Sequence, residues 1–310
     1  MAGLSDVPLK ARTAIFATLT VFCGAVIAFT AKLTTARVPP FEQIFIRSLL
    51  CLAASSLLGG SGLPALSRSP NWMWLVARGV LGFLASMCYM EAAQRMPLIT
   101  VAIVTRMHPL MGPAIVRLLS GERVLAQQGV GYLVGIVGVS VATPEDTWRA
   151  TSPYSFGFNY IMAATVTTAL SFHCIYKLTK LQEDKAAVRD AFHVAGLVGG
   201  VFFGVLRRKV LAQPTLLELA YIAAGAVATI GLQWGLSHLF EAGKRVNVVP
   251  FLLLAPVFSG CFGMLLGEGT LRQEESLGVS LIALALAIGY LGIFGYNGYS
   301  EDEDDGKKKS

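Results

Sequence analysis

The chain has 310 residues, of which 54% are hydrophobic and only 14% are charged, and its mean hydropathy is +0.61. A soluble protein carries about a quarter charged residues, so the surplus of apolar side chains must face lipid. The formal net charge of +6 comes from cations that are scattered along the chain rather than gathered in one patch, which argues against a nucleic-acid-binding protein.

Ten apolar runs follow a short polar segment at residues 1–12, and each is close to the roughly 20 residues that a helix needs to cross a bilayer. They lie at 13–33, 41–60, 72–93, 98–119, 125–143, 155–177, 189–206, 215–239, 247–267 and 277–296. The first run is long enough to span, so no removable signal peptide is expected. The pattern predicts an all-α integral membrane protein with ten transmembrane helices.

Four landmarks recur in the same order in the two halves of the chain. The third run ends in EAAQRM and the eighth in EAGKRV, Pro109 and Pro256 follow, and each half then reaches Gly-Glu, at 121–122 and 267–268. A duplication explains this order better than chance agreement of short apolar segments. We therefore expect a five-helix repeat at 13–143, a linker at 144–154 and a second repeat at 155–296. Because five is odd, the second repeat should be inverted in the membrane.

The loops on the N-terminal side of the predicted helices carry the larger share of Lys and Arg, which predicts that both termini are cytoplasmic. The tail at 297–310 is charged and is expected to be disordered. Its last residues, KKKS, place Lys307 and Lys308 as in a dilysine retrieval signal. In a eukaryote this predicts an endoplasmic reticulum or Golgi membrane, and otherwise we expect the plasma membrane. A solvated run of charges is the alternative reading.

The segment RGVLGFLASMCYMEAAQRMPLITVAIVTRMHPLMGPAIVRLLSGERV (78–124) resembles the third and fourth helices of an EamA-type repeat. That repeat defines the drug/metabolite transporter superfamily, which includes the solute carrier 35-like carriers. The segment FLLLAPVFSGCFGMLLGEGT (251–270) is similar to the second copy, with Gly269 in place of the usual arginine. The resemblance implies two inverted five-helix repeats, a substrate held between them and transport by alternating access. It also implies that the fourth and ninth helices line the site.

Arg106 is the most unusual residue of the fourth run. It lies about 14 Å into the bilayer, counted from Pro97 at 1.5 Å per residue, where an arginine costs roughly 2.5–3.5 kcal/mol. Pro109 has no N–H, so the carbonyl of Thr105 loses its helical partner and a kink is expected. We therefore predict that Arg106 and Thr105 bind the substrate in a cavity. The alternative is a structural ion pair of Arg106 with Glu42 or Glu91.

Further polar residues within the runs are weaker candidates. Four side chains that could bind substrate are His173, Tyr176, Trp234 and His238. Residues expected to have gating or structural roles are Arg47, Arg78, His108, Pro109 and Pro256. Arg47 and Arg78 are close enough to a helix end to snorkel. His108 is about 200° around the helix from Arg106, so the two side chains should face different directions.

The function that these features predict is a secondary-active transporter of a small polar, anionic metabolite. The alternatives are an exporter of amino acids or amphiphilic drugs and, more remotely, a multi-span membrane enzyme or receptor. The sequence shows no P-loop, no metal-binding cluster and no nucleophile beside a base, so no catalytic residue, cofactor or metal is expected. The five cysteines lie in apolar runs without a CxxC pair. Expected partners are a small-molecule substrate and the lipid bilayer, with the protein a monomer or a homodimer.

Overall fold

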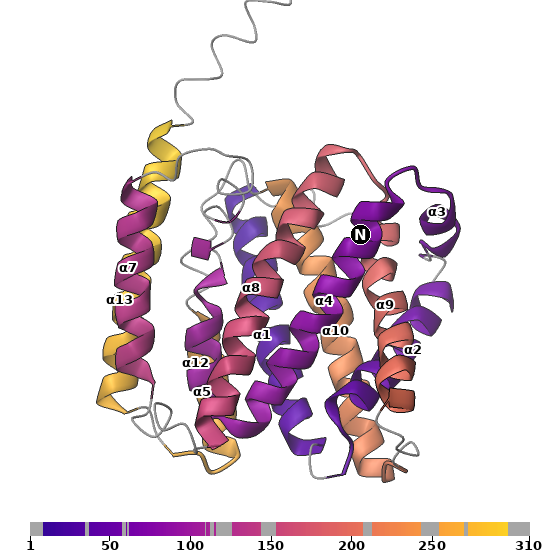
Figure 1. Ribbon diagram of the computed structural model, residues 1–310, viewed down its shortest axis with the longest axis horizontal. Helices are drawn as coiled ribbons and strands as arrows, with labels where there is room; N and C mark the ends of the chain where they lie inside the picture. The colour runs from indigo at the N-terminus through magenta and orange to yellow at the C-terminus, as the bar shows by residue number, and fades with distance from the viewer. Residues whose placement is uncertain are drawn as a thin grey trace, which may run out of the picture.

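The computed structural model describes residues 9–34, 37–57, 60, 62–108, 110–111, 115, 126–143, 153–206, 213–242, 254–269 and 272–296. Within these residues the regular structure is entirely α-helical (Figure 1). The predicted tail, most of the N-terminal segment and the linker up to residue 152 lie outside the described residues. Pro109 and the first Gly-Glu pair lie outside them as well.

The described helices follow the order of the predicted apolar runs. They are α1 (Leu9–Thr34), α2 (Pro40–Leu57), α3 (Leu63–Arg68), α4 (Trp72–Arg95), α5 (Leu98–Thr105), α7 (Ala126–Ala142), α8 (Pro153–Lys180), α9 (Lys185–Leu206), α10 (Leu216–Ala242), α12 (Leu254–Leu265) and α13 (Gln273–Tyr296). Each predicted run contains one of these helices, and α3 is an addition that the sequence analysis treated as a connection.

By length and composition, five helices of the described chain are able to cross a membrane. They are Ala11–Thr34, Trp72–Arg95, Ser155–Lys180, Lys185–Leu206 and Leu216–Leu239, and the shorter segments Gly129–Ala142 and Leu254–Leu265 are also apolar. Large apolar side chains such as Leu133, Val205 and Val227 are more than half exposed on the outside of the bundle. These findings confirm an all-α, multi-span membrane protein.

Local sequence signals explain several helix ends. Met96 ends α4 in an extended conformation (φ −126°, ψ 157°) because it precedes Pro97, which disfavours helical geometry in the residue before it. Thr215 and Glu218 form a capping box at the start of α10, with Thr215 N–H donating to Glu218 Oε2 at 2.7 Å and Glu218 N–H donating to Thr215 Oγ1 at 3.3 Å. These signals set where one helix stops and the next begins.

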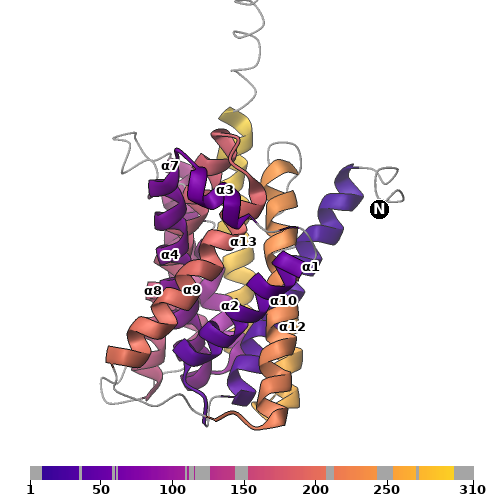
Figure 2. The same ribbon diagram turned by 90° about the vertical axis from the view of Figure 1, so that its right-hand side faces the viewer.

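The helices pack in pairs that each join the first half of the chain to the second. The most extensive contacts are between α7 and α13, α4 and α8, α1 and α10, and α2 and α9, and α5 packs on α12. Figure 1 shows the α7–α13 pair at one edge of the bundle, and in Figure 2 the pair lies behind the other helices. Its main contacts with the other helices are made through α5. The interior of the protein is therefore an interface between its halves.

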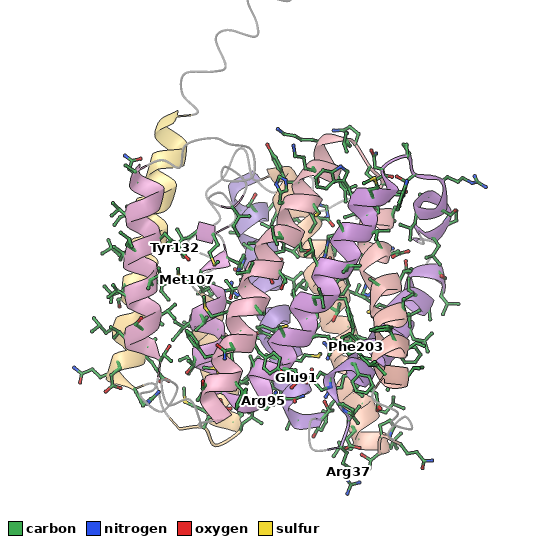
Figure 3. All side chains as sticks on the ribbon, in the orientation of Figure 1. Arg37, Glu91, Arg95, Met107, Tyr132 and Phe203 are labelled. Atoms are coloured by element: carbon green, nitrogen blue, oxygen red, sulfur yellow. The ribbon has the colours of Figure 1, made fainter. Side chains whose placement is uncertain are left out.

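Four acids of the described chain, three of them buried and Glu268 half-buried, form ion pairs near helix ends. The pairs are Glu91–Arg95, Asp190–Arg189, Glu268–Lys32 and Glu275–Arg272. Figure 3 shows Glu91 and Arg95 close together near the lower end of the bundle. Glu268 also accepts the Leu98 N–H at 2.8 Å, so it ties the end of α1 to the start of α5.

Candidate functional site

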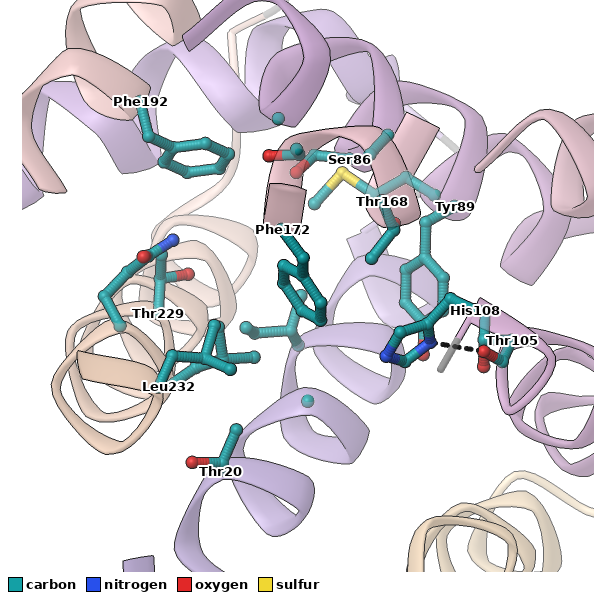
Figure 4. Close-up of a pocket in the computed structure, with 18 of the residues that line it drawn as sticks. Thr20, Ser86, Tyr89, Thr105, His108, Thr168, Phe172, Phe192, Thr229 and Leu232 are labelled. Carbon is teal, nitrogen blue, oxygen red and sulfur yellow. Dashed lines mark hydrogen bonds between the residues drawn. The ribbon is translucent and has the colours of Figure 1, made fainter. Parts of the chain in front are cut away.

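A cavity of about 240 Å³ lies between helices from both halves of the chain. Its wall is formed by residues of α1, α2, α4, α8, α9, α10 and α12 and by the segment from Ala102 to His108. Figure 4 shows Phe172 in its middle, with Tyr89, Thr105 and His108 on one side and Phe192, Thr229 and Leu232 on the other. The cavity is thus a place where a ligand would contact both halves at once.

Three arginines line this cavity. Arg47 and Arg78 are 6% and 3% exposed, and Arg106 lies at the end of α5. No aspartate or glutamate is among the described residues that line it. The lining therefore carries positive charge, together with neutral polar side chains such as Ser86 and Thr168.

Arg78 is fixed by three other helices. Its Nη1 donates to Ser171 Oγ of α8 at 2.7 Å, and its Nη2 donates to Gln233 Oε1 of α10 at 3.3 Å. The guanidinium carbon lies 5.2 Å from the centre of the Phe192 ring of α9, within the range of a cation–π contact. Arg78 therefore connects α4 to α8, α9 and α10 while it lines the cavity.

Arg47 and His193 are buried with polar atoms that find no hydrogen-bond partner in the described part of the chain. These atoms are Nε and Nη2 of Arg47 and both ring nitrogens of His193, whose side chain is only 1% exposed. Arg47 Nη2 lies against Gly225 of α10, where a built Cβ would come within 2.7 Å of it. The absence of a side chain at Gly225 is what gives the guanidinium its room.

The helix break expected near Pro109 begins at Arg106. Helix α5 ends at Thr105, and the amides of Arg106 and Met107 bond to carbonyls three residues back, at 3.1 and 3.0 Å. Such bonds mark the tighter turn that often ends an α-helix. The Thr105 carbonyl is in contact with Nδ1 of His108 (Figure 4). Arg106 and His108 both line the cavity.

The other predicted site residues lie elsewhere. His238 stacks on Phe16 with ring centres 4.4 Å apart, and Trp234, which is 41% exposed, packs against both rings. His173 contacts Trp74 at 6.1 Å, and Tyr176 is 40% exposed beneath Lys180. None of these four candidates lines the cavity. Pro256 is buried in the first turn of α12, next to Ala255, which does line it.

Sequence reasoning missed His193, Gln233 and Phe192 as cavity residues. His193 and Gln233 are polar residues within apolar runs, the same signal that selected His173 and His238. That signal was therefore present, but a single sequence does not say which face of each helix is turned inward.

A cavity lined by three arginines inside a bundle of apolar helices is an arrangement typical of membrane transporters. Residues 11–143 match the model of the EamA-like transporter family. The match confirms the resemblance to the drug/metabolite transporter superfamily, whose EamA-type members are transporters.

The fold extends over nearly the whole chain. Twenty-six solved chains resemble it, and one crystal structure of a protein superposes with a TM-score of 0.61 at 21% sequence identity. That match covers 91% of this chain and 97% of the other. No curated protein matches the sequence. At this level of identity the likeness concerns the fold alone.

Proposed function

We propose that the protein is a secondary-active transporter of a small anionic metabolite, which it moves by alternating access between its two halves. The observation that carries this proposal is the cavity lined by Arg47, Arg78 and Arg106, with no acid among its described lining residues. A guanidinium offers donors in a planar fork that matches a carboxylate or a phosphate, and it stays charged at any accessible pH.

The size and polarity of the cavity separate this proposal from its alternatives. Its volume of about 240 Å³ is below the roughly 300–1,000 Å³ of pockets that hold drug-sized ligands, which favours a small metabolite over an amphiphilic drug. An amino acid would also need an acceptor for its ammonium group, and the described lining offers no carboxylate. Of the two acids that were alternatives as structural partners of Arg106, Glu42 and Glu91, the second is paired with Arg95.

The helix pairing supports two inverted repeats at 13–143 and 155–296. In the two repeats, α1 corresponds to α8 and α4 corresponds to α10. Replacing each helix by its counterpart turns the α1–α10 pair into the α8–α4 pair, and both pairs make extensive contacts. The pairs α2–α9, α5–α12 and α7–α13 each join a helix to its own counterpart. A pseudo-twofold axis produces this pattern, and rocking of one repeat against the other would open the cavity to alternate sides.

Transport assays with purified protein in proteoliposomes test the proposed function. Counterflow of a panel of small labelled acids should identify at least one substrate, and Arg106→Ala should reduce its uptake about a hundredfold or more. Arg106→Lys keeps the charge but loses the fork, so weak uptake should remain. Arg37→Gln is the matched control because Arg37 is exposed and lies away from the cavity (Figure 3). Normal uptake by Arg106→Ala would refute the anionic-substrate proposal.

The cytoplasmic position of both termini is a separate proposal, supported by the distribution of Lys and Arg. A cysteine placed by Glu301→Cys in a variant without the native cysteines should react with an impermeant maleimide only after the cells are permeabilised. Labelling of intact cells would reverse the orientation.

A further inference from the structure

Arg47 combines a permanent charge with an unsatisfied donor edge inside the bundle. Its Nε and Nη2 atoms are buried and have no hydrogen-bond partner in the described chain, although buried polar groups are normally paired. These two atoms lie on one edge of the guanidinium, and this edge holds a carboxylate or phosphate through two parallel hydrogen bonds. Arg78 donates with both of its terminal nitrogens, to Ser171 and Gln233, and has its Nε buried without a partner, whereas Arg47 has both atoms of one edge without a partner.

His193 adds a second unsatisfied group from the facing helix α9. Both ring nitrogens are buried without a described partner, and the charged groups that act on the ring are Arg189, Arg78 and Arg47, all of them cations. The nearest acid along α9, Asp190, is already occupied by Arg189, by Ser55 and by the Gly62 N–H at 2.7 Å. The surroundings of His193 and Arg47 therefore lack an anion that the described protein could supply.

This pair lies on the opposite side of the cavity from Arg106. His193 is in ring contact with Phe192, and the Arg47 guanidinium touches α10 at Gly225, one turn before Thr229. In Figure 4, Phe192, Thr229 and Leu232 lie on one side of Phe172, whereas Thr105 and His108, which flank Arg106, lie on the other. A ligand that reached both sides would pass the apolar middle of the cavity.

We propose that Arg47 and His193 form a second anion-binding centre, and that the substrate carries two acidic groups separated by a short apolar segment. One group would bind at Arg106 and the other between the free edge of Arg47 and a ring N–H of His193. The inference rests on the proposed function, because it concerns the same cavity, and it restricts the substrate class from anions in general to compact molecules with two acids.

Binding to the purified full-length protein in detergent tests this inference. The probes are pairs of similar size that differ in one acidic group, butyrate with succinate and glycerol 3-phosphate with 3-phosphoglycerate, compared at equal ionic strength by thermal shift titration. In at least one pair, the compound with two acids should bind the wild-type protein about tenfold or more tightly than its partner, since a hydrogen-bonded charge pair contributes at least that factor.

The variant Arg47→Gln should remove this advantage, so that it binds the compound with two acids no more tightly than the compound with one, and His193→Gln should reduce the advantage less. Arg37→Gln should behave as the wild type. If Arg47→Gln does not give a monodisperse protein, Arg47→Lys, which keeps the charge and loses the fork, should show a reduced advantage.

Two results would overturn the inference while the proposed function stands. One is that wild-type protein binds both members of every pair equally, and the other is that the arginine variants keep the two-acid advantage. If no acid binds the wild type and none is transported in proteoliposomes, the proposed function itself is refuted, and this inference with it.

Discussion

The cations at the helix ends and those around the cavity differ in whether an acid of the described chain is paired with them. Near the helix ends, Lys32, Arg95, Arg189 and Arg272 each pair with a buried or half-buried acid. In the cavity, Arg47 and Arg78 are more deeply buried than any of these four, and no acid of the described chain is paired with either of them. Burial of a charge is costly unless a counter-charge accompanies it.

This difference shows that the chain has acids available and places them away from the cavity. The helix-end pairs hold neighbouring segments together, as Glu268 does with the ends of α1 and α5. Arg47 and Arg78 keep their charge without an acid of the described chain beside it, which is the arrangement that an anionic ligand would complete. Three predictions test the contrast, from the largest expected effect to the smallest.

The largest effect should follow from placing an acid in the cavity. Ser86 of α4 lines it and is visible in Figure 4. Ser86→Asp should lower uptake of the anionic substrate about a hundredfold, because the new carboxylate would compete for the guanidinium groups. Ser86→Asn has nearly the same size and no charge, so it should retain most of the uptake. Equal uptake by the two variants would show that charge in the cavity is irrelevant to transport.

An intermediate effect should follow from breaking a helix-end pair. Glu268→Gln leaves Lys32 without its counter-charge, and the cost should be at most about 3–5 kcal/mol of unfolding free energy because both side chains are partly exposed. Thermal unfolding in detergent measures this loss. The preference for anionic substrates should not change. The double variant Lys32→Met/Glu268→Met should be more stable than Glu268→Met alone, and a cycle that shows strict additivity would contradict the pairing.

The smallest effects should come from a matched pair of glycine substitutions. Gly225→Ala places a methyl group 2.7 Å from Arg47 Nη2 and 2.9 Å from Thr30 Oγ1, so the guanidinium must move. Binding of a two-acid compound should weaken several-fold, with little change in stability because the displaced group ends a flexible side chain. At Gly129 of α7 a Cβ meets nothing within 4 Å, so Gly129→Ala should stabilise the helix by about 0.5–1 kcal/mol. It should leave binding unchanged.

Much of the fold was predictable because the length of an apolar run is a direct consequence of bilayer thickness. Helix α3 was missed because its six residues are too short to form an apolar stripe. Arg106 was found because a charge within a long apolar run is conspicuous by itself.

The rest of the candidate site depends on which helices become neighbours. Counted along their own helices, Arg47 and Arg78 are near enough to an end to snorkel, but contacts with α9 and α10 bury them in the cavity wall. His238 and Trp234 have the same kind of sequence context as Gln233, yet they pack around Phe16. The hydrophobic period of α10 is nearly absent, since the helix is apolar on all sides, so no pattern distinguishes these faces.

The contact between His108 and the Thr105 carbonyl determines where the imidazole carries its proton. A carbonyl oxygen only accepts hydrogen bonds, so Nδ1 must be the donor, and in the neutral ring Nε2 is then an acceptor. The side of the cavity next to Arg106 thus presents an acceptor beside a set of donors. An acid that carries a hydroxyl group next to its carboxylate can satisfy both, whereas the corresponding unsubstituted acid leaves the imidazole lone pair without a partner.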